Sequence, residues 1–270
     1  MKTILCPIDF SDNSRQGLAY ATEFAKVIDA RLLLIYIAPI PYLDPDTFIA
    51  DPLVENLEES RGQLAALCRE LSAKVSCEYM AQSGSAPDMI TTVARERHID
   101  WIIIGTKGAG NKPEALVGSV AVEVSRNAPC PTVVIPQDAR FGSIRKIVLA
   151  TDFEAANQQL LTPLIEIAQQ TQAQVLALHI ETNKTELSEQ KAVEALRLEE
   201  WLGDVPASVH VLVRDDIQEG IDEFAREQQA DMVVVVARKH GFFASLFHRS
   251  ITRLITLYTT VPTLVIPEQD

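Results

Sequence analysis

Four small residues in two groups are spaced to form a phosphate-binding loop: Gly105 and Gly108, then Gly118 and Ser119. The hexapeptide 105–110 (GTKGAG) follows the apolar run 100–104, and nine residues separate Gly108 from Gly118-Ser119. Glycine adopts positive φ and lets a ligand approach the backbone closely. The segment 120–124 then predicts a helix whose first N–H groups and positive dipole end favour an anion. A strand, a glycine loop and a helix N-terminus in this order predict a phosphate site.

The same glycines have a plainer interpretation, because glycine is also the commonest residue of turns. The segment is neither a Walker loop, which needs Gly-Lys followed by Ser or Thr, nor a dinucleotide GxGxxG fingerprint. Lys107 lies between two of the glycines, where it either neutralises a phosphate or points to solvent. The phosphate interpretation therefore depends on the whole spaced set and not on any single glycine.

Length and composition indicate two globular domains. The chain has 270 residues, of which 47% are hydrophobic and 23% charged, as in ordinary globular proteins. No apolar run approaches the length of about 18 residues that a membrane span needs, and residues 1–5 pass straight into a strand without a signal-peptide pattern. We expect a cytoplasmic protein without a membrane partner.

Charge and cysteine spacing exclude other classes. The net charge of −13 argues against nucleic-acid binding, which needs a basic face. None of the four cysteines forms a CxxC pair, so neither a zinc site nor a disulfide scaffold is expected. We predict buried reduced thiols at Cys6, Cys68, Cys77 and Cys130.

An internal repeat determines the predicted architecture. The segment 131–136 (PTVVIP) returns as 262–267 (PTLVIP), an offset of 131 that also relates 100–104 to 231–235. At the front, 4–10 matches 147–153 at an offset of 143. The difference of 12 residues between the two offsets predicts a shorter middle in the second copy. The chain therefore contains one domain twice.

Within the first copy, apolar strand patterns alternate with amphipathic helix patterns. Ser11, Asp12 and Asn13 offer N-cap oxygens, and Pro87 fits a first helical turn. The fold class that follows is α/β, with two tandem doubly wound domains, each a mainly parallel five-stranded sheet flanked by helices. The expected elements are strands at 2–10, 31–38, 74–82, 100–104 and 131–136, and helices at 14–29, 53–73 and 87–98.

Residues 137–144 are the predicted linker between the copies. The predicted domains are 1–138, with the complete glycine set, and 144–270, with a degenerate one. Eight residues are too few for wide independent motion, so we expect the copies to pack together.

The spacing Gly-x2-Gly-x9-Gly-Ser resembles the nucleotide-binding signature of the universal stress protein family, and the segments 6–11 and 131–136 fit the same family. The resemblance implies a Rossmann-like fold that binds an adenine nucleotide, most often ATP, with or without magnesium. The residues it implies for this site are Pro7, Ile8, Asp9, Ile37, Gly105, Thr106, Gly108, Gly118, Ser119 and Val120.

The resemblance also implies roles for these residues. Asp9 would accept hydrogen bonds from the adenosine, Ile37 would form an apolar wall for adenine, and the glycines would surround the phosphates. Asp9 has a second interpretation, since an acid between a strand and a helix often caps backbone N–H groups. Ala121 departs from the family pattern, which often has threonine here, and we expect weaker binding from the missing hydroxyl, by about 0.5–1.5 kcal/mol.

The second copy lacks the glycines. Val236, Lys239 and Arg249 stand at the positions of Gly105, Gly108 and Gly118, and only the serine is kept, as Ser250. The replacing segment, Arg238–Arg249, mixes basic side chains with three phenylalanines. It either fills the vacated pocket or docks a protein partner.

Three hypotheses of function follow: an ATP-binding stress-response regulator, a slow ATPase that uses the same site, and a scaffold that needs no nucleotide. No catalytic residue and no metal ligand can be assigned, since no histidine lies beside the motif and no second carboxylate for magnesium is evident. The resemblance further implies that the two copies pair as a pseudo-dimer, and a homodimer of chains is also expected.

Overall fold

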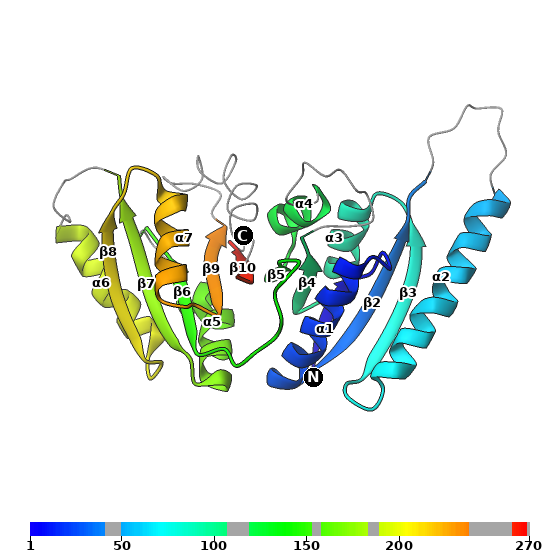
Figure 1. Ribbon diagram of the computed structural model, residues 1–270, viewed down its shortest axis with the longest axis horizontal. Helices are drawn as coiled ribbons and strands as arrows, with labels where there is room; N and C mark the ends of the chain where they lie inside the picture. The colour runs from blue at the N-terminus through cyan, green and yellow to red at the C-terminus, as the bar shows by residue number, and fades with distance from the viewer. Residues whose placement is uncertain (41–49, 107–118, 153–157, 183–188, 238–260, 269–270) are drawn as a thin grey trace. The chain divides into compact units, whose positions relative to one another are not determined.

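The computed structural model describes residues 1–40, 50–106, 119–152, 158–182, 189–237 and 261–268 (Figure 1). The chain divides into two compact units, Met1–Arg140 and Phe141–Asp270. Residues 108 and 118 of the glycine set and the segment 238–260 lie outside the described residues.

The first unit is a doubly wound α/β domain. Within its described residues the strand order is β3-β2-β1-β4-β5, and the pairings are parallel. This confirms the predicted fold class. Its elements are β1 (Lys2–Pro7), α1 (Asp12–Val27), β2 (Ala30–Ala38), α2 (Ala50–Leu71), β3 (Cys77–Ser83), α3 (Ala86–Glu96), β4 (Trp101–Gly105), α4 (Ser119–Asn127) and β5 (Thr132–Ile135).

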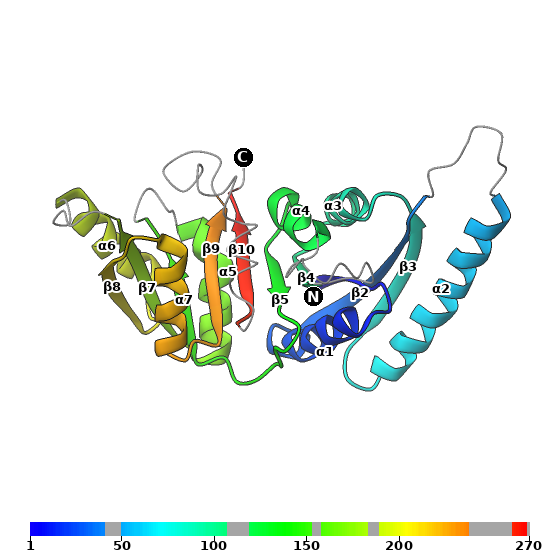
Figure 2. The same ribbon diagram turned by 45° about the horizontal axis from the view of Figure 1, so that its top comes forward.

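Helices cover both faces of this sheet, as Figures 1 and 2 show for α1 on one side and α3 with α4 on the other. On the first face the Phe24 ring of α1 meets Trp101 of β4 edge-on, with ring centroids 5.5 Å apart. Trp101 is paired in register with Ile4 of β1, and Ile4 is paired with Leu32 of β2, so the three side chains lie on the same face of the sheet. Tyr36 lies on the same face as Leu32, because side chains alternate along a strand, and it reaches α2. The core consists of strands buried between these layers.

The second unit has the same fold. Its described strands are ordered β10-β9-β6-β7-β8, also with parallel pairings. Helix α6 has 14 residues where α2 has 22, in keeping with the shorter middle predicted from the offsets. The elements are β6 (Lys146–Ala150), α5 (Gln158–Thr171), β7 (Gln174–Glu181), α6 (Glu189–Leu202), β8 (Ala207–Val213), α7 (Ile217–Glu227), β9 (Met232–Ala237) and β10 (Thr263–Pro267).

Two backbone features repeat between the units. Asp100 accepts the N–H of Thr3 at 2.8 Å, and Asp231 accepts the N–H of Lys146 at 3.0 Å, at matching positions of the repeat. Asp29 and Gln172 both follow a helix with positive φ, as do His98 and Gln229. These left-handed residues end the helices and turn the chain back into the sheet. The sequence repeat therefore preserves the turns as well as the core.

The first strand is shorter than expected. It ends at Pro7 and not at residue 10, because Phe10 adopts φ 62° and turns the chain toward α1. Of the three N-cap candidates Ser11, Asp12 and Asn13, Ser11 is the N-cap of that helix, and its hydroxyl accepts the N–H of Ser14 at 3.2 Å. A bulky residue in the left-handed region is uncommon, so this turn is held by the surrounding structure.

The prediction of four reduced thiols is wrong for two of them. Cys68 of α2 and Cys77 of β3 form a disulfide, with Cα atoms 5.3 Å apart. The spacing of nine residues gave no signal, because the two cysteines meet through the packing of a helix on an edge strand. Cys6 and Cys130 are buried free thiols, as predicted.

Burial raises the pKa of the Cys6 thiol to about 12 from 9.0. The pKa of Cys130 is also raised to about 12, by burial and then by the Asp100 carboxylate. The unfolded chain therefore loses thiol protons above about pH 9 while the folded chain keeps them until about pH 12. The folded state binds more protons in that window, so stability falls there by roughly 1.4 kcal/mol per pH unit for each thiol.

We expect the variant Cys6→Ala to lose less stability than the wild type between about pH 9 and pH 10.5, because one of these thiols is gone. Urea unfolding midpoints at several pH values measure the two slopes. If the stability of the two proteins falls equally with pH, the raised pKa of Cys6 is contradicted.

In the described part of the chain, none of the helices combines the length and apolar character that crossing a membrane requires.

Candidate functional site

The strand ends place the predicted site residues at one edge of the first sheet. Pro7 pairs with Ile35, so two residues further on Asp9 lies level with Ile37. The β1–β4 register, Leu5 with Ile102, extends to bring Asp9 level with Thr106. Strands β2, β1 and β4 are neighbours, so Ile37, Asp9 and Thr106 lie at the carboxyl ends of three adjacent strands. Ligands of doubly wound sheets bind at such an edge, where the strand order reverses.

Asp9 makes the capping contacts that its second interpretation predicts. Its Oδ1 accepts the Ser11 N–H at 3.1 Å and the Ser11 hydroxyl at 2.6 Å. The half-buried carboxylate is thereby fixed at the start of α1. Both of these hydrogen bonds go to one of the two carboxylate oxygens.

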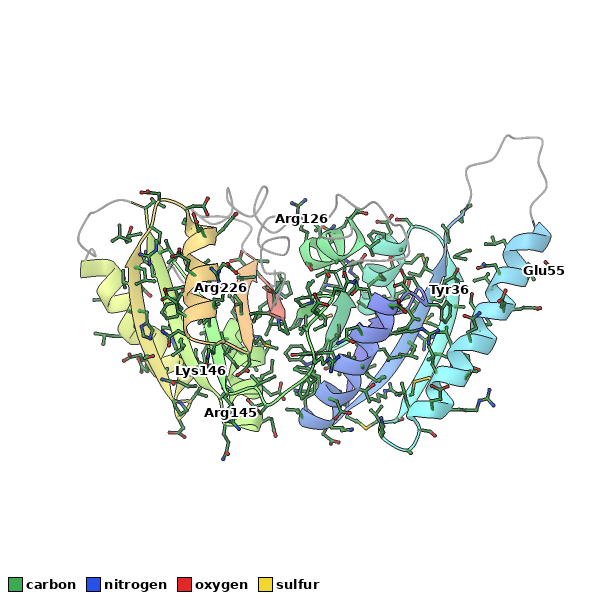
Figure 3. All side chains as sticks on the ribbon, viewed as in Figure 1. Tyr36, Glu55, Arg126, Arg145, Lys146 and Arg226 are labelled. Carbon is green, nitrogen blue, oxygen red and sulfur yellow. A yellow bond between two sulfur atoms is a disulfide. The ribbon has the colours of Figure 1, made fainter. Side chains whose placement is uncertain are left out.

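An aromatic pair holds the Asp9 loop against the sheet. The Phe10 ring packs against Tyr36 with centroids 5.3 Å apart. Tyr36, labelled in Figure 3, comes from β2 and donates its hydroxyl to Asn56 Oδ1 of α2 at 3.1 Å. No pattern in the sequence predicts these contacts, which connect the Asp9 loop to α2.

Gly105 is glycine for a reason that the sequence did not show. Its φ is not positive, unlike that of Gly84 and Gly203. A Cβ on Gly105 would lie 2.9 Å from the Asn13 carbonyl oxygen of α1. Gly17, one turn further along α1, would meet the Gly105 backbone at 3.3 Å. The two glycines let the start of α1 approach the end of β4 closely, so Gly105 serves helix packing at least.

Thr106 is 5% exposed, and its N–H donates to Ile135 O at 3.0 Å. That donor extends the β4–β5 ladder, so the hydroxyl and the carbonyl of Thr106 are what remain for a ligand. Ser119 begins α4 and is exposed, and Val120 is half-buried. The first turn of α4 carries no acidic residue, which leaves its positive dipole end unopposed from within the turn.

The corresponding edge of the second unit differs in shape. Val236 occupies the position of Gly105, and Asp152, the counterpart of Asp9, is 5% exposed. Ile180 is 4% exposed where its counterpart Ile37 is half-buried, and Gly220 of α7 packs against it. The wall that Ile37 offers in the first unit is therefore covered in the second.

The histidines that the structure describes are structural. His179 of β7 is buried, with Nδ1 2.9 Å from Thr151 O and Nε2 3.1 Å from Glu181 Oε1. His210 Nε2 lies 2.9 Å from the Ser208 hydroxyl. His98 ends α3, at the amino edge of the sheet and away from the site. Among the described residues, no group of three or more His, Cys, Asp or Glu side chains is arranged to hold a metal.

The fold and the residues at the carboxyl edge of the first sheet define a class of protein, a duplicated doubly wound α/β protein with a glycine-containing strand-to-helix loop in its first copy. The universal stress protein family matches residues 1–136 and again 143–267. The chain belongs to that family, in the tandem form that the repeat predicts.

Relatives match one or both copies. A universal stress protein of Methanocaldococcus jannaschii is 29% identical over 140 residues, covering 50% of this chain and 81% of that protein. One from Mycolicibacterium smegmatis is 23% identical over 287 residues, covering 97% and 96%. The crystal structure of an Archaeoglobus fulgidus universal stress protein has a TM-score of 0.74 at 18% identity, covering 99% of this chain and 97% of that one. The structural match supports the fold of both units.

Proposed function

We propose that the chain is a stress-response regulator that binds one adenine nucleotide, ATP with or without magnesium, in its first unit. The base and ribose lie on Ile37 and Asp9, and the phosphates lie between the loop after Gly105 and the start of α4. The second unit is structural or binds a protein partner.

One observation carries this proposal. Three of the residues that the family resemblance singled out in separate segments of the sequence, Ile37, Asp9 and Thr106, lie at the ends of three adjacent parallel strands. The first turn of α4, to which the glycine loop leads, has no carboxylate that would repel phosphate. An apolar side chain, a fixed carboxylate and a helix N-terminus are the groups that a purine, a ribose and a phosphate tail require.

The geometry favours binding over rapid turnover. The Asp9 carboxylate is engaged with the helix cap, and the described residues at this edge include no histidine that would act as a general base. ATP bound here supplies a polyphosphate whose charge changes on exchange for ADP. The chain's own residues orient the base, hold the loop and expose the bound phosphates to a partner.

The test measures what the purified protein carries. Freshly purified protein is denatured, and the released small molecules are identified by chromatography with mass detection. We expect about one adenine nucleotide per chain from the wild type and none from Gly118→Arg, which introduces the residue that the second copy has. Arg249→Gly, the opposite exchange in the second copy, is the matched control and keeps the wild-type amount.

Circular dichroism establishes that both variants fold. Wild-type protein without nucleotide, and without a thermal shift on addition of ATP and magnesium, would overturn the proposal in favour of the scaffold. Phosphate release by the wild type that is absent in Gly118→Arg would establish the slow ATPase instead.

A further inference from the structure

One buried polar atom near the candidate site lacks a donor in the part of the chain that the structure describes. It is the Oε1 atom of Gln82, on β3, which is buried and accepts no hydrogen bond from the described residues. A buried amide oxygen without a donor destabilises a protein, so such groups are uncommon in native structures and call for an explanation.

Gln82 lies at the level of the candidate site. It is paired in register with Ile37, and Ile37 lies level with Asp9. Neighbouring strands are about 4.8 Å apart, so Gln82 is about 10 Å from Asp9, two strands away. A ribose at Asp9 with its base lying over Ile37 brings the far edge of the base toward Gln82.

The side chain is also on the correct face. Residues paired in register point to the same side of a sheet, and neighbours along a strand point to opposite sides. Gln82 and Ile37 therefore face away from Tyr36 and α2, toward the side of α3 and α4. The start of α4, where the proposed phosphate site lies, is on this side.

The second unit shows that the fold does not need a polar residue here. Its strand register pairs Ile180 with Leu212, which places Leu212 at the position of Gln82. Leucine has no polar side-chain atom and makes no hydrogen bond. The unit with the complete glycine set has the amide, and the unit without it has a hydrocarbon side chain.

We propose that Gln82 recognises the exocyclic amine of the adenine base, so that the site prefers 6-aminopurines to purines without a group at C6. The amine donates a hydrogen bond to Oε1, which turns toward it at small cost because the terminal amide torsion of glutamine is broad. A purine with only hydrogen at C6 offers no donor at this place, so Oε1 keeps no partner. This inference rests on the proposed nucleotide site.

The experiment compares ATP with purine riboside triphosphate, which carries hydrogen in place of the amine. Dissociation constants are measured by calorimetry with magnesium present. We expect the wild type to prefer ATP by about tenfold, the effect of one hydrogen bond to a buried group. In Gln82→Leu the affinity for ATP falls by about that factor, the affinity for purine riboside triphosphate stays within about twofold, and the preference disappears.

Two controls separate recognition from folding. Gln63→Leu, on the exposed side of α2 where Gln63 donates to Glu59, keeps the wild-type preference. The Tm of nucleotide-free Gln82→Leu equals or exceeds that of the wild type, because leucine removes the unpaired oxygen. A lower Tm with equal losses for both nucleotides would overturn the inference, since Gln82 would then act on the fold.

The failure of this inference differs from the failure of the proposed function. If ATP binds and Gln82→Leu keeps the preference for it, the inference alone is wrong. If the wild type binds neither nucleotide, the nucleotide site itself is wrong, and the inference with it.

Discussion

Gly105→Val is expected to destabilise the first unit by about 3 kcal/mol, although valine is the residue that the second copy has at this position. A Cβ on Gly105 would lie 2.9 Å from the Asn13 carbonyl oxygen, and backbone cannot move aside as a flexible side chain would. Overpacking of this kind costs about 1–3 kcal/mol or more. The expected fall in Tm is roughly 10 °C for a unit of this size.

Thermal unfolding by calorimetry measures this effect. The matched control is Gly62→Ala on α2, where a new Cβ meets nothing within 4 Å. Alanine there raises stability by about 0.5–1 kcal/mol through helix propensity. An unchanged Tm for Gly105→Val would show that α1 can retreat from β4, and the packing explanation for this glycine would be wrong.

Loss of the Cys68–Cys77 disulfide is the second large effect expected. The bridge closes a short loop of nine-residue separation, and the entropy it removes from the unfolded chain corresponds to about 2–3 kcal/mol. The contribution of the disulfide is increased because few buried residues hold α2 against the sheet. The buried residues among the helix positions whose side chains are described form a single stripe, Ser60, Leu64 and Cys68. Reduction of the disulfide therefore loosens the contact of Cys68, the C-terminal residue of this stripe, with Cys77 of β3.

Scanning calorimetry with and without a thiol reductant measures the loss as a lower Tm. Mass detection after alkylation counts the thiols released. The variant Cys68→Ala/Cys77→Ala is the control, and its Tm does not respond to the reductant. A wild-type Tm that is equally insensitive, although both thiols become alkylated, would contradict a stabilising role for the bridge.

The disulfide also bears on where the protein works. Disulfides persist in oxidising compartments and are rare in reducing ones. The expectation of a cytoplasmic protein rested on two sequence patterns, the lack of a membrane-length apolar run and the lack of a signal-peptide pattern, and neither reports on the redox state of a compartment. Alkylation of protein taken directly from cells, before any oxidation in air, determines whether Cys68 and Cys77 are joined there.

Local patterns were sufficient to predict the architecture. The alternation of apolar strand runs with amphipathic helix runs, and two constant offsets, predicted a duplicated doubly wound fold. A strand buried on both faces appears in the sequence as a continuous apolar run, and a helix packed on one face appears as a 3.6-residue period. The Ser11 cap and Pro87 in the first turn of α3 were predicted for the same reason, since each acts within one helical turn. The expected end of β1 was wrong, because nothing local announces a phenylalanine with positive φ.

The sequence by itself determined the family, the repeat and the set of segments that contain the candidate site. Only the tertiary structure decided that Gly105 makes room for α1, that Cys68 meets Cys77, and that Gln82, beside Ile37, carries a buried oxygen to which none of the described residues donates. Each of these depends on which strand lies beside which and in what register. Those contacts join residues far apart along the chain or on different elements, and no periodicity within one element encodes them.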